Sequence, residues 1–287
     1  MTRKALTSIG ALLFVSLTAC TSRTGRAVSD GTRSLAADSG VQWVDVDAPE
    51  GGTMRIAVAR PIGTGPFPAV IILHGTHGFA REYVQLARDL ATHGIVGVAA
   101  CWFSGRRGAG IQFITPLECP EAPPLPDDSD PNRFRVASLS IAALLQAVRS
   151  VPGVRGDDVA VFGHSRGGGA VLNYALSDTG TVAALVLNST GYPSEVIARA
   201  STLRVPVLIM HGTADIPADG GSARTAIAQV RKFEVALRGF QKEVEVRYYD
   251  RGRHNGIFQD RAQYDDQVQR IATFIRAHSR QKATQSD

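Results

Sequence analysis

The sequence predicts a single-domain α/β fold, in which eight strands form a mostly parallel, doubly wound sheet that begins with an antiparallel hairpin. Three observations support this prediction. Apolar runs of strand length alternate with longer stretches of helical spacing, an order typical of sheets that carry helices on both faces. Most of these runs are apolar without alternation, as buried parallel strands are. The two opening runs flank a turn-forming segment, Pro49-Glu50-Gly51-Gly52.

Residues 41–47 and 53–59 lie on either side of that turn and alternate apolar with polar side chains, so they are predicted to pair as the hairpin. Continuous apolar runs predict buried strands at 69–73, 95–100, 159–162, 182–187 and 205–210. Residues 244–249 are predicted to form the eighth strand. Helical spacing predicts helices at 82–93, 133–150, 168–176, 222–239 and 261–278.

The sheet and its helices are expected to form one domain over residues 41–279, followed by a disordered tail at 280–287. One long irregular segment, residues 102–130, interrupts the alternation. A loop of this length in a compact domain is more often functional than idle. The formal net charge is +5, without a long stripe of Lys and Arg. A nucleic-acid partner is therefore not expected.

The first 40 residues indicate export. Arg3 and Lys4 precede an apolar run at 9–19, which is shorter than the roughly 20 residues needed to span a bilayer. Residues 1–19 are predicted to be a signal peptide, and residues 20–40 a flexible tether rich in Ser, Thr, Gly and Asp. The tetrad Leu17-Thr18-Ala19-Cys20 resembles the lipobox of bacterial lipoproteins.

That resemblance implies that Cys20 is lipidated and anchors the protein in the cell envelope, at the outer membrane if the host has one. An ordinary secretory peptide, giving a secreted protein, is the alternative. Lipidation of Cys20 would leave Cys101 and Cys119, which the oxidising compartment could join as a disulfide. Two free thiols too far apart to bridge are the other interpretation of this pair.

The segment Gly163-His164-Ser165-Arg166-Gly167 lies between a predicted strand and a predicted helix. This is the context of a Gly-x-Ser-x-Gly nucleophile elbow, in which the serine occupies a sharp, strained turn. Gly163 and Gly167 leave space where side chains would clash with that turn. The helix that follows directs its N-terminus at the site, where an oxyanion can bind. We therefore predict that Ser165 is a nucleophile.

On these residues the chain resembles the α/β-hydrolase superfamily over about residues 41–278, and within it the dienelactone-hydrolase-like and bacterial-cutinase-like serine esterases. Gly163-His-Ser-Arg-Gly-Gly-Gly is similar to the Gly-His-Ser-Met-Gly-Gly-Gly elbow of bacterial cutinases. Asp250-Arg-Gly-Arg-His254-Asn-Gly-Ile-Phe258 is similar to the dienelactone-hydrolase segment in which His-Gly-Phe follows a Gly-containing loop, with Asn255 inserted. Dienelactone hydrolases proper carry Cys where this chain has Ser165. The resemblance implies a hydrolase.

The acid and the histidine of a triad follow Ser165 in the chain order that this fold requires. Asp215 lies just past the run 205–210, at the edge of the sheet where site residues gather. Asp219 is the rival acid. His254 follows the last predicted strand in a Gly-containing loop, and it alone of the seven histidines holds that place. In such a triad His254 exchanges the proton of Ser165, and Asp215 orients the imidazole.

An oxyanion hole needs two backbone N–H groups, and one should come from Arg166, directly after the nucleophile. By resemblance to cutinases the other comes from Thr76, with His77 as its rival. The spacing of His74 and His77 would suit two metal ligands, but no third ligand is in view, so an ordering role in the loop is expected. The prediction includes no metal and no organic cofactor. His164 is expected to pack inside the fold.

Five residues are candidates for a substrate wall beside the nucleophile: His77, Trp102, Phe103, Arg106 and Arg107. The last four follow the fourth predicted strand, and an arginine pair there could bind a carboxylate. A plain surface loop is an equal alternative. The sequence as a whole predicts hydrolysis of small-molecule or lipid-like carboxylic esters through an acyl-serine intermediate. An acyltransferase or peptidase on the same triad, and a non-catalytic envelope lipoprotein, are the alternatives.

Overall fold

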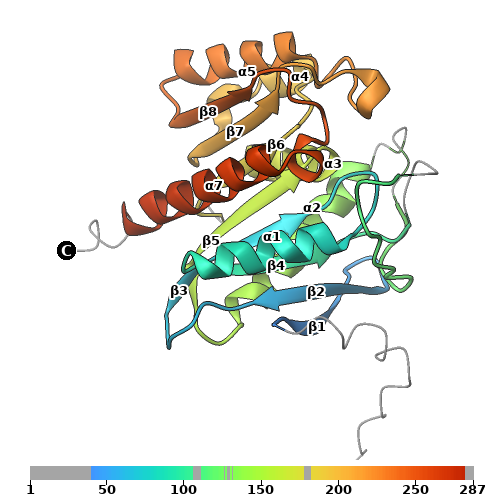
Figure 1. The fold of residues 1–287 in the computed structure, drawn as a ribbon, viewed down its shortest axis with the longest axis vertical. Helices are drawn as coiled ribbons and strands as arrows, with labels where there is room; N and C mark the ends of the chain where they lie inside the picture. Colours follow the sequence, from blue (N-terminus) through green and yellow to red (C-terminus); the bar gives the residue numbers. More distant parts are fainter. Residues whose placement is uncertain are drawn as a thin grey trace, which may run out of the picture. The chain divides into compact units, whose positions relative to one another are not determined.

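Figure 1 shows the fold in a computed structural model, which describes residues 40–105, 111–125, 127, 130, 132–177 and 182–281. The eight strands form one sheet in the order β1-β2-β4-β3-β5-β6-β7-β8. β1 pairs antiparallel with β2, β2 pairs antiparallel with β4, and every later pairing is parallel. The predicted fold class and the opening hairpin are thus confirmed. The strands are β1 (Gln42–Asp47), β2 (Thr53–Ala59), β3 (Phe67–Leu73), β4 (Val96–Cys101), β5 (Val154–His164), β6 (Leu185–Asn188), β7 (Val207–Gly212) and β8 (Val244–Tyr249).

The helices cover both faces of this sheet. α1 and α7 pack on one face, in front of the strands in Figure 1, and α2, α3 and α5 pack on the other. The helices are α1 (Arg81–Thr92), α2 (Arg133–Arg149), α3 (Arg166–Ser177), α4 (Ser194–Ile197), α5 (Ile227–Gly239), α6 (Gly256–Gln259) and α7 (Arg261–Gln281). Two short 3-10 turns lie at Ala200–Thr202 and Pro217–Asp219.

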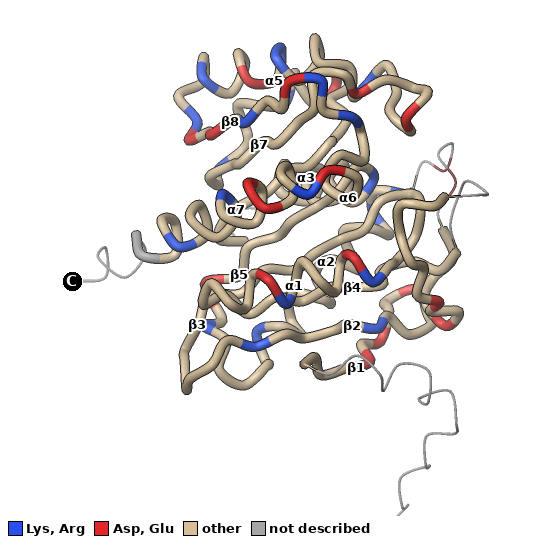
Figure 2. The backbone as a smooth tube through the Cα atoms, in the orientation of Figure 1, with Lys and Arg blue, Asp and Glu red and all other residues tan. Residues whose placement is uncertain are grey.

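The core lies on both sides of the sheet because successive strand residues point to opposite faces. In β3, Ile71 packs among the side chains of α2 and α3, whereas its neighbour Ile72 packs among those of α1 and α7. Both side chains are at most 1% exposed, and burying an aliphatic side chain of this size stabilises the fold by about 2 kcal/mol. Figure 2 shows no charged residue on the inner strands β3, β4, β6 and β7. This burial explains why their sequences are continuous apolar runs.

The helix predicted at 222–239 is wrong by about one turn, because α5 begins only at Ile227. The hydroxyl of Thr225 accepts a hydrogen bond from the backbone N–H of Ser222 at 2.8 Å and donates one to the carboxylate of Asp215 at 2.7 Å. These bonds hold the preceding residues in a turn instead of a helix. The same turn thus supports a residue of the candidate site.

A disulfide joins Cys101, the last residue of β4, to Cys119 in the long connection that follows. The pair predicted from the sequence is therefore bonded in the structure. Within the described part of the chain, no helix is both long and apolar enough to span a bilayer. The predicted signal peptide, Cys20 and the tail at 282–287 lie outside the described residues.

Candidate active site

Ser165 occupies the turn between β5, which ends at His164, and α3, which begins at Arg166. Its φ angle is 51°, in the left-handed region that is costly for a residue with a side chain. The turn is tight enough to require glycine: a Cβ on Gly163 would lie 2.4 Å from the backbone of Gly167. The backbone N–H of Ser165 donates to the carbonyl of Asn188 at 2.9 Å, which fixes the elbow to the end of β6.

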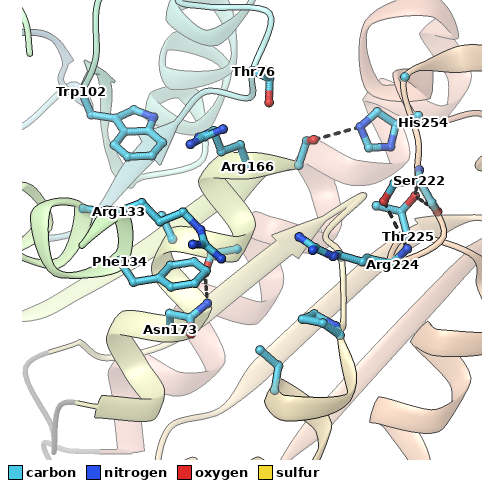
Figure 3. Close-up of a pocket in the computed structure, with 18 residues that line it drawn as sticks. Thr76, Trp102, Arg133, Phe134, Arg166, Asn173, Ser222, Arg224, Thr225 and His254 are labelled. Carbon is cyan, nitrogen blue, oxygen red and sulfur yellow. Dashed lines mark hydrogen bonds between the residues drawn. The ribbon is translucent and has the colours of Figure 1, made fainter. Parts of the chain in front are cut away.

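The structure brings together the three residues predicted to act as a triad, from three separate loops. The Oγ of Ser165 lies 2.9 Å from Nε2 of His254 (Figure 3), and Nδ1 of the same ring lies 2.8 Å from Oδ2 of Asp215. Ser165 follows β5, Asp215 follows β7 and His254 follows β8. The two hydrogen bonds form a continuous path along which a proton can leave the serine while the carboxylate orients the imidazole.

Asp215 is charged at neutral pH. Burial opposes the charge, but hydrogen bonds from His211 and His254 outweigh that effect and hold the pKa of the carboxyl well below its usual value. Nε2 of His211 lies 3.2 Å from Oδ2, and the hydroxyl of Thr225 donates to Oδ1. The rival acid, Asp219, points elsewhere: its carboxylate lies 3.7 Å from the guanidinium of Arg253.

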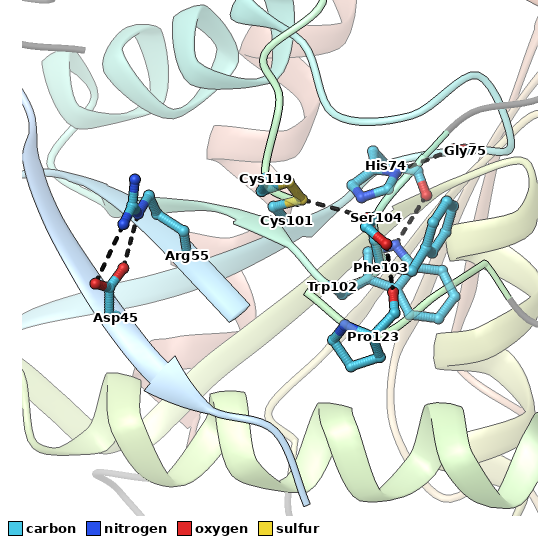
Figure 4. Close-up of a disulfide and its surroundings, with 10 residues drawn as sticks. All are labelled: Asp45, Arg55, His74, Gly75, Cys101, Trp102, Phe103, Ser104, Cys119 and Pro123. Carbon is cyan, nitrogen blue, oxygen red and sulfur yellow. Dashed lines mark hydrogen bonds and ion pairs between the residues drawn. A yellow bond between two sulfur atoms is a disulfide. The ribbon is translucent and has the colours of Figure 1, made fainter. Parts of the chain in front are cut away.

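The loop after β3, residues 74–79, lies against the nucleophile elbow. A Cβ on Gly75 would lie 3.3 Å from the Cβ of Ser165. The backbone N–H of Gly78 donates to the carbonyl of Gly75 at 3.0 Å, which closes a turn with Thr76 and His77 at its centre. Nε1 of Trp102 donates to the carbonyl of His74 at 3.1 Å (Figure 4), so the disulfide-bonded segment supports this loop.

A cavity of about 380 Å³ opens beside Ser165 and His254 (Figure 3). Thr76, Trp102 and Arg166 are among its lining residues. The complete lining consists of Thr76, Trp102, Arg133, Phe134, Ala137, Ser165, Arg166, Gly169, Ala170, Asn173, Gly191, Pro193, Val196, Gly220, Ser222, Arg224, Thr225 and His254.

Two of the predicted wall residues do not line this cavity. The ring of His77 turns inward and its Nε2 lies 2.7 Å from the hydroxyl of Tyr83. Phe103 is 1% exposed and packs on the ring of His74, with ring centroids 4.3 Å apart. Both aromatic rings are therefore part of the core beneath the loop at 74–79. The remaining two predicted wall residues, Arg106 and Arg107, lie outside the described residues.

The cavity contains arginine side chains that the sequence analysis did not predict there. Arg133, Arg166 and Arg224 line it, and no Asp or Glu is among the described lining residues. In Figure 3 the guanidinium groups of Arg133 and Arg224 face each other, and that of Arg166 points toward Trp102. The guanidinium of Arg133 also stacks over the ring of Phe134, at 4.4 Å from its centroid, which restricts its orientation. Such an arrangement can bind a carboxylate or another anion.

His164 has polar partners in addition to its predicted packing. Its Nδ1 lies 2.7 Å from Oδ1 of Asn188, and its Nε2 lies 3.2 Å from Oδ1 of Asn255. Burial and the nearby His254 ring lower the pKa of His164 to about 3, so the ring is neutral. The amide of Asn255 also donates to the carbonyl of Asp219 at 2.9 Å. The residue inserted after His254 thus links the nucleophile elbow to the loop of the acid.

The profile of the dienelactone hydrolase family matches residues 54–276. The chain belongs to the dienelactone hydrolase family. This membership covers β2 to α7 and includes all the loops described above, and it makes the protein a hydrolase. A search of curated proteins finds no significant match.

Solved structures with this fold include members of the same family. A putative dienelactone hydrolase from Klebsiella pneumoniae is 21% identical, over 85% of this chain and 100% of its own, with a TM-score of 0.59. The dienelactone hydrolase from Anabaena variabilis is 17% identical, over 83% and 97% of the two chains, with a TM-score of 0.60. A thermostable carboxyl esterase from Bacillus coagulans is 13% identical, over 84% and 99%, with a TM-score of 0.62.

Proposed function

We propose that this dienelactone hydrolase family member hydrolyses carboxylic esters through an acyl-serine intermediate. The observation that carries the proposal is the unbroken hydrogen-bonded path from Ser165 through His254 to Asp215, with distances of 2.9 and 2.8 Å. Ser165 lines a cavity, from which an ester carbonyl could approach its Oγ. The carboxyl esterase among the solved structures adds support from a protein with the same fold.

In the proposed reaction the Oγ of Ser165 attacks the ester carbonyl carbon while Nε2 of His254 accepts its proton. Asp215, charged and bonded to Nδ1, stabilises the imidazolium that forms. The negative charge on the carbonyl oxygen is stabilised by backbone N–H groups of Thr76 and Arg166. When the tetrahedral intermediate collapses, His254 gives the proton to the leaving alcohol. Water, deprotonated by the same histidine, then attacks the acyl-serine and releases the acid.

The cavity favours esters that carry a negative charge away from the scissile bond. Arg133, Arg166 and Arg224 line the same cavity, and no acidic residue is among its described lining residues. A hydrogen bond to a charged group contributes about 1.5–3 kcal/mol, so a well-placed carboxylate would raise kcat/KM about tenfold or more. These three arginines belong to α2, α3 and the loop before α5, whereas Arg106 and Arg107, which the sequence suggested for a carboxylate, lie outside the described residues.

The test compares two esters that differ in one charge, p-nitrophenyl butyrate and p-nitrophenyl hemisuccinate. We expect both to be hydrolysed by the wild type, the hemisuccinate with the higher kcat/KM, and neither above background by Ser165→Ala. Arg133→Gln and Arg224→Gln should reduce the preference, whereas Arg238→Gln, on an exposed arginine paired with Glu234, should preserve it. Faster hydrolysis of a matched amide would favour a peptidase, and equal activity of Ser165→Ala would favour the non-catalytic alternative.

We further propose that the enzyme acts in the cell envelope, attached to a membrane by lipid on Cys20. The proposal rests on the lipobox-like tetrad that ends at Cys20 and on the apolar run before it. The tether would give the catalytic domain room to reach dissolved or membrane-associated esters. A disulfide such as that between Cys101 and Cys119 is typical of an oxidising, exported environment.

A further inference from the structure

The hydroxyl of Tyr83 makes two hydrogen bonds to the loop at 74–79. It accepts the backbone N–H of Gly75 at 3.0 Å and lies 2.7 Å from Nε2 of His77. Tyr83 is on α1 and is fully buried, and burial raises the pKa of its hydroxyl. The hydroxyl therefore keeps its proton, which it can donate to the neutral His77 ring.

His77 is suited to accept that proton. Burial and the neighbouring rings of His164, His74 and His254 lower its pKa to about 2, so one ring nitrogen carries a lone pair. The rings of His77 and Tyr83 stack, with centroids 5.7 Å apart and planes 21° from parallel. A hydroxyl that accepts from Gly75 and donates to His77 uses its hydrogen and one lone pair.

Thr76 lies between the two residues that this hydroxyl holds. The turn closed by Gly78 and Gly75 places Thr76 and His77 at its centre, where backbone N–H groups have no partner within the turn itself. Because the Gly75 N–H is occupied by Tyr83 and the His77 ring is turned inward, the Thr76 peptide is fixed from both sides. Thr76 also lines the cavity beside Ser165.

We propose that Tyr83 is a positioning residue for the oxyanion hole, which it serves by holding the Thr76 peptide between Gly75 and His77. This inference rests on the proposed esterase mechanism for its effect on rate. Trp102 bonds the same loop before Thr76, at the carbonyl of His74. Preorganised donors are effective because they need no reorganisation as charge develops, and the Tyr83 hydroxyl supplies that preorganisation.

The decisive variant is Tyr83→Phe, which removes a single oxygen atom. Loss of a whole oxyanion donor costs about 100- to 1,000-fold in kcat, so a donor that remains but is loosened should cost about 10- to 100-fold. KM for p-nitrophenyl butyrate should stay within about twofold, because the donors act mainly in the transition state. Tyr249→Phe is the matched control: it also removes a tyrosine hydroxyl, which on β8 donates to the carboxylate of Asp266 on α7 at 2.9 Å, and it should leave kcat unchanged.

Amide hydrogen exchange gives a second measurement that does not depend on catalysis. We expect faster exchange in the peptide that covers residues 74–79 in Tyr83→Phe, and no change there in Tyr249→Phe. Unchanged exchange in that peptide would refute the claim that the hydroxyl holds the loop. Faster exchange with unchanged kcat would show that the bond is structural only and would overturn the positioning role.

These outcomes are distinct from a failure of the proposed function. If the wild type hydrolyses no ester faster than Ser165→Ala, the mechanism fails, while the exchange data still decide whether Tyr83 holds the loop. Should Tyr83→Phe not fold, His77→Phe removes the other partner and keeps the stacked rings. It is expected to shift exchange and kcat in the same direction by a smaller factor, and no shift in either would refute the proposal.

Discussion

Three buried histidines should make the protein sensitive to mild acid. Burial, the largest cause in each case, lowers the pKa of His74 to about 3, of His77 to about 2 and of His164 to about 3. All three rings are neutral in the folded protein, and all three would titrate near 6.5 in the unfolded chain. The unfolded state therefore binds more protons below pH 6.5. The stability that these groups contribute is complete above that pH and is lost as the pH falls.

The size of the effect follows from the pH interval. A pH of 5 is about 1.5 units below the pKa of a histidine in the unfolded chain, while the folded ring is still neutral. Each histidine therefore lowers the free energy of unfolding by about 2 kcal/mol at this pH. For three residues the loss between pH 8 and pH 5 is about 6 kcal/mol. This loss is comparable to the total stability of a typical domain, roughly 5–15 kcal/mol. Asp215, whose pKa is lowered, adds to the loss only below about pH 4.

The assay is urea unfolding of the purified domain at several pH values between 8 and 5. We expect the free energy of unfolding to fall ever more steeply below pH 6.5. The slope should approach the value for about three more protons bound by the unfolded state than by the folded state. His77→Phe should reduce the loss between pH 8 and pH 5 by about one third. A free energy of unfolding that is constant over this range would refute the assignment of these rings as buried and neutral.

Three further experiments test separate parts of the account. Asp215→Asn should lower kcat about 10,000-fold while Asp219→Asn stays near the wild type, measured with p-nitrophenyl butyrate; the reverse result would exchange the two acids. The Cys101→Ser/Cys119→Ser double variant should lose about 3 kcal/mol of stability and raise KM more than it lowers kcat. An unchanged Tm and KM would show that the bond does not support the cavity. Cys20→Ser should move the protein from the membrane fraction to the soluble fraction, and a wild type recovered wholly soluble would contradict lipid anchoring.

The parts of the site that follow from chain order could be predicted from the sequence. The glycines around Ser165 are required by a turn in which a Cβ would overlap backbone atoms, so the local sequence carries the signal. Asp215 could be placed because it follows a buried strand, and His254 because it follows the last strand of the same parallel arrangement, where strand ends meet at one edge. The apolar runs of the inner strands are equally local, which is why the sheet was predictable.

Other features depend on contacts between distant segments, and the sequence did not reveal them. Arg133 and Arg224 are near no motif and reach the cavity only because α2 and the loop before α5 lie beside it. His77 was expected at the cavity, but its ring bonds Tyr83 on α1 instead. The late start of α5 results from the bond between Thr225 and Asp215. The signal in the sequence for this later start was Thr225 in the predicted first turn, because Thr favours turns and helix caps over helix interiors.

The most direct test of the central claim, that Ser165 is an activated nucleophile, is labelling with a fluorophosphonate followed by peptide mass spectrometry. The account predicts one adduct per chain, on the peptide that contains Ser165. His254→Ala should label far more slowly, because the serine then lacks the base that lies 2.9 Å away. No adduct on Ser165 in folded wild-type protein, or equal labelling without His254, would contradict the account.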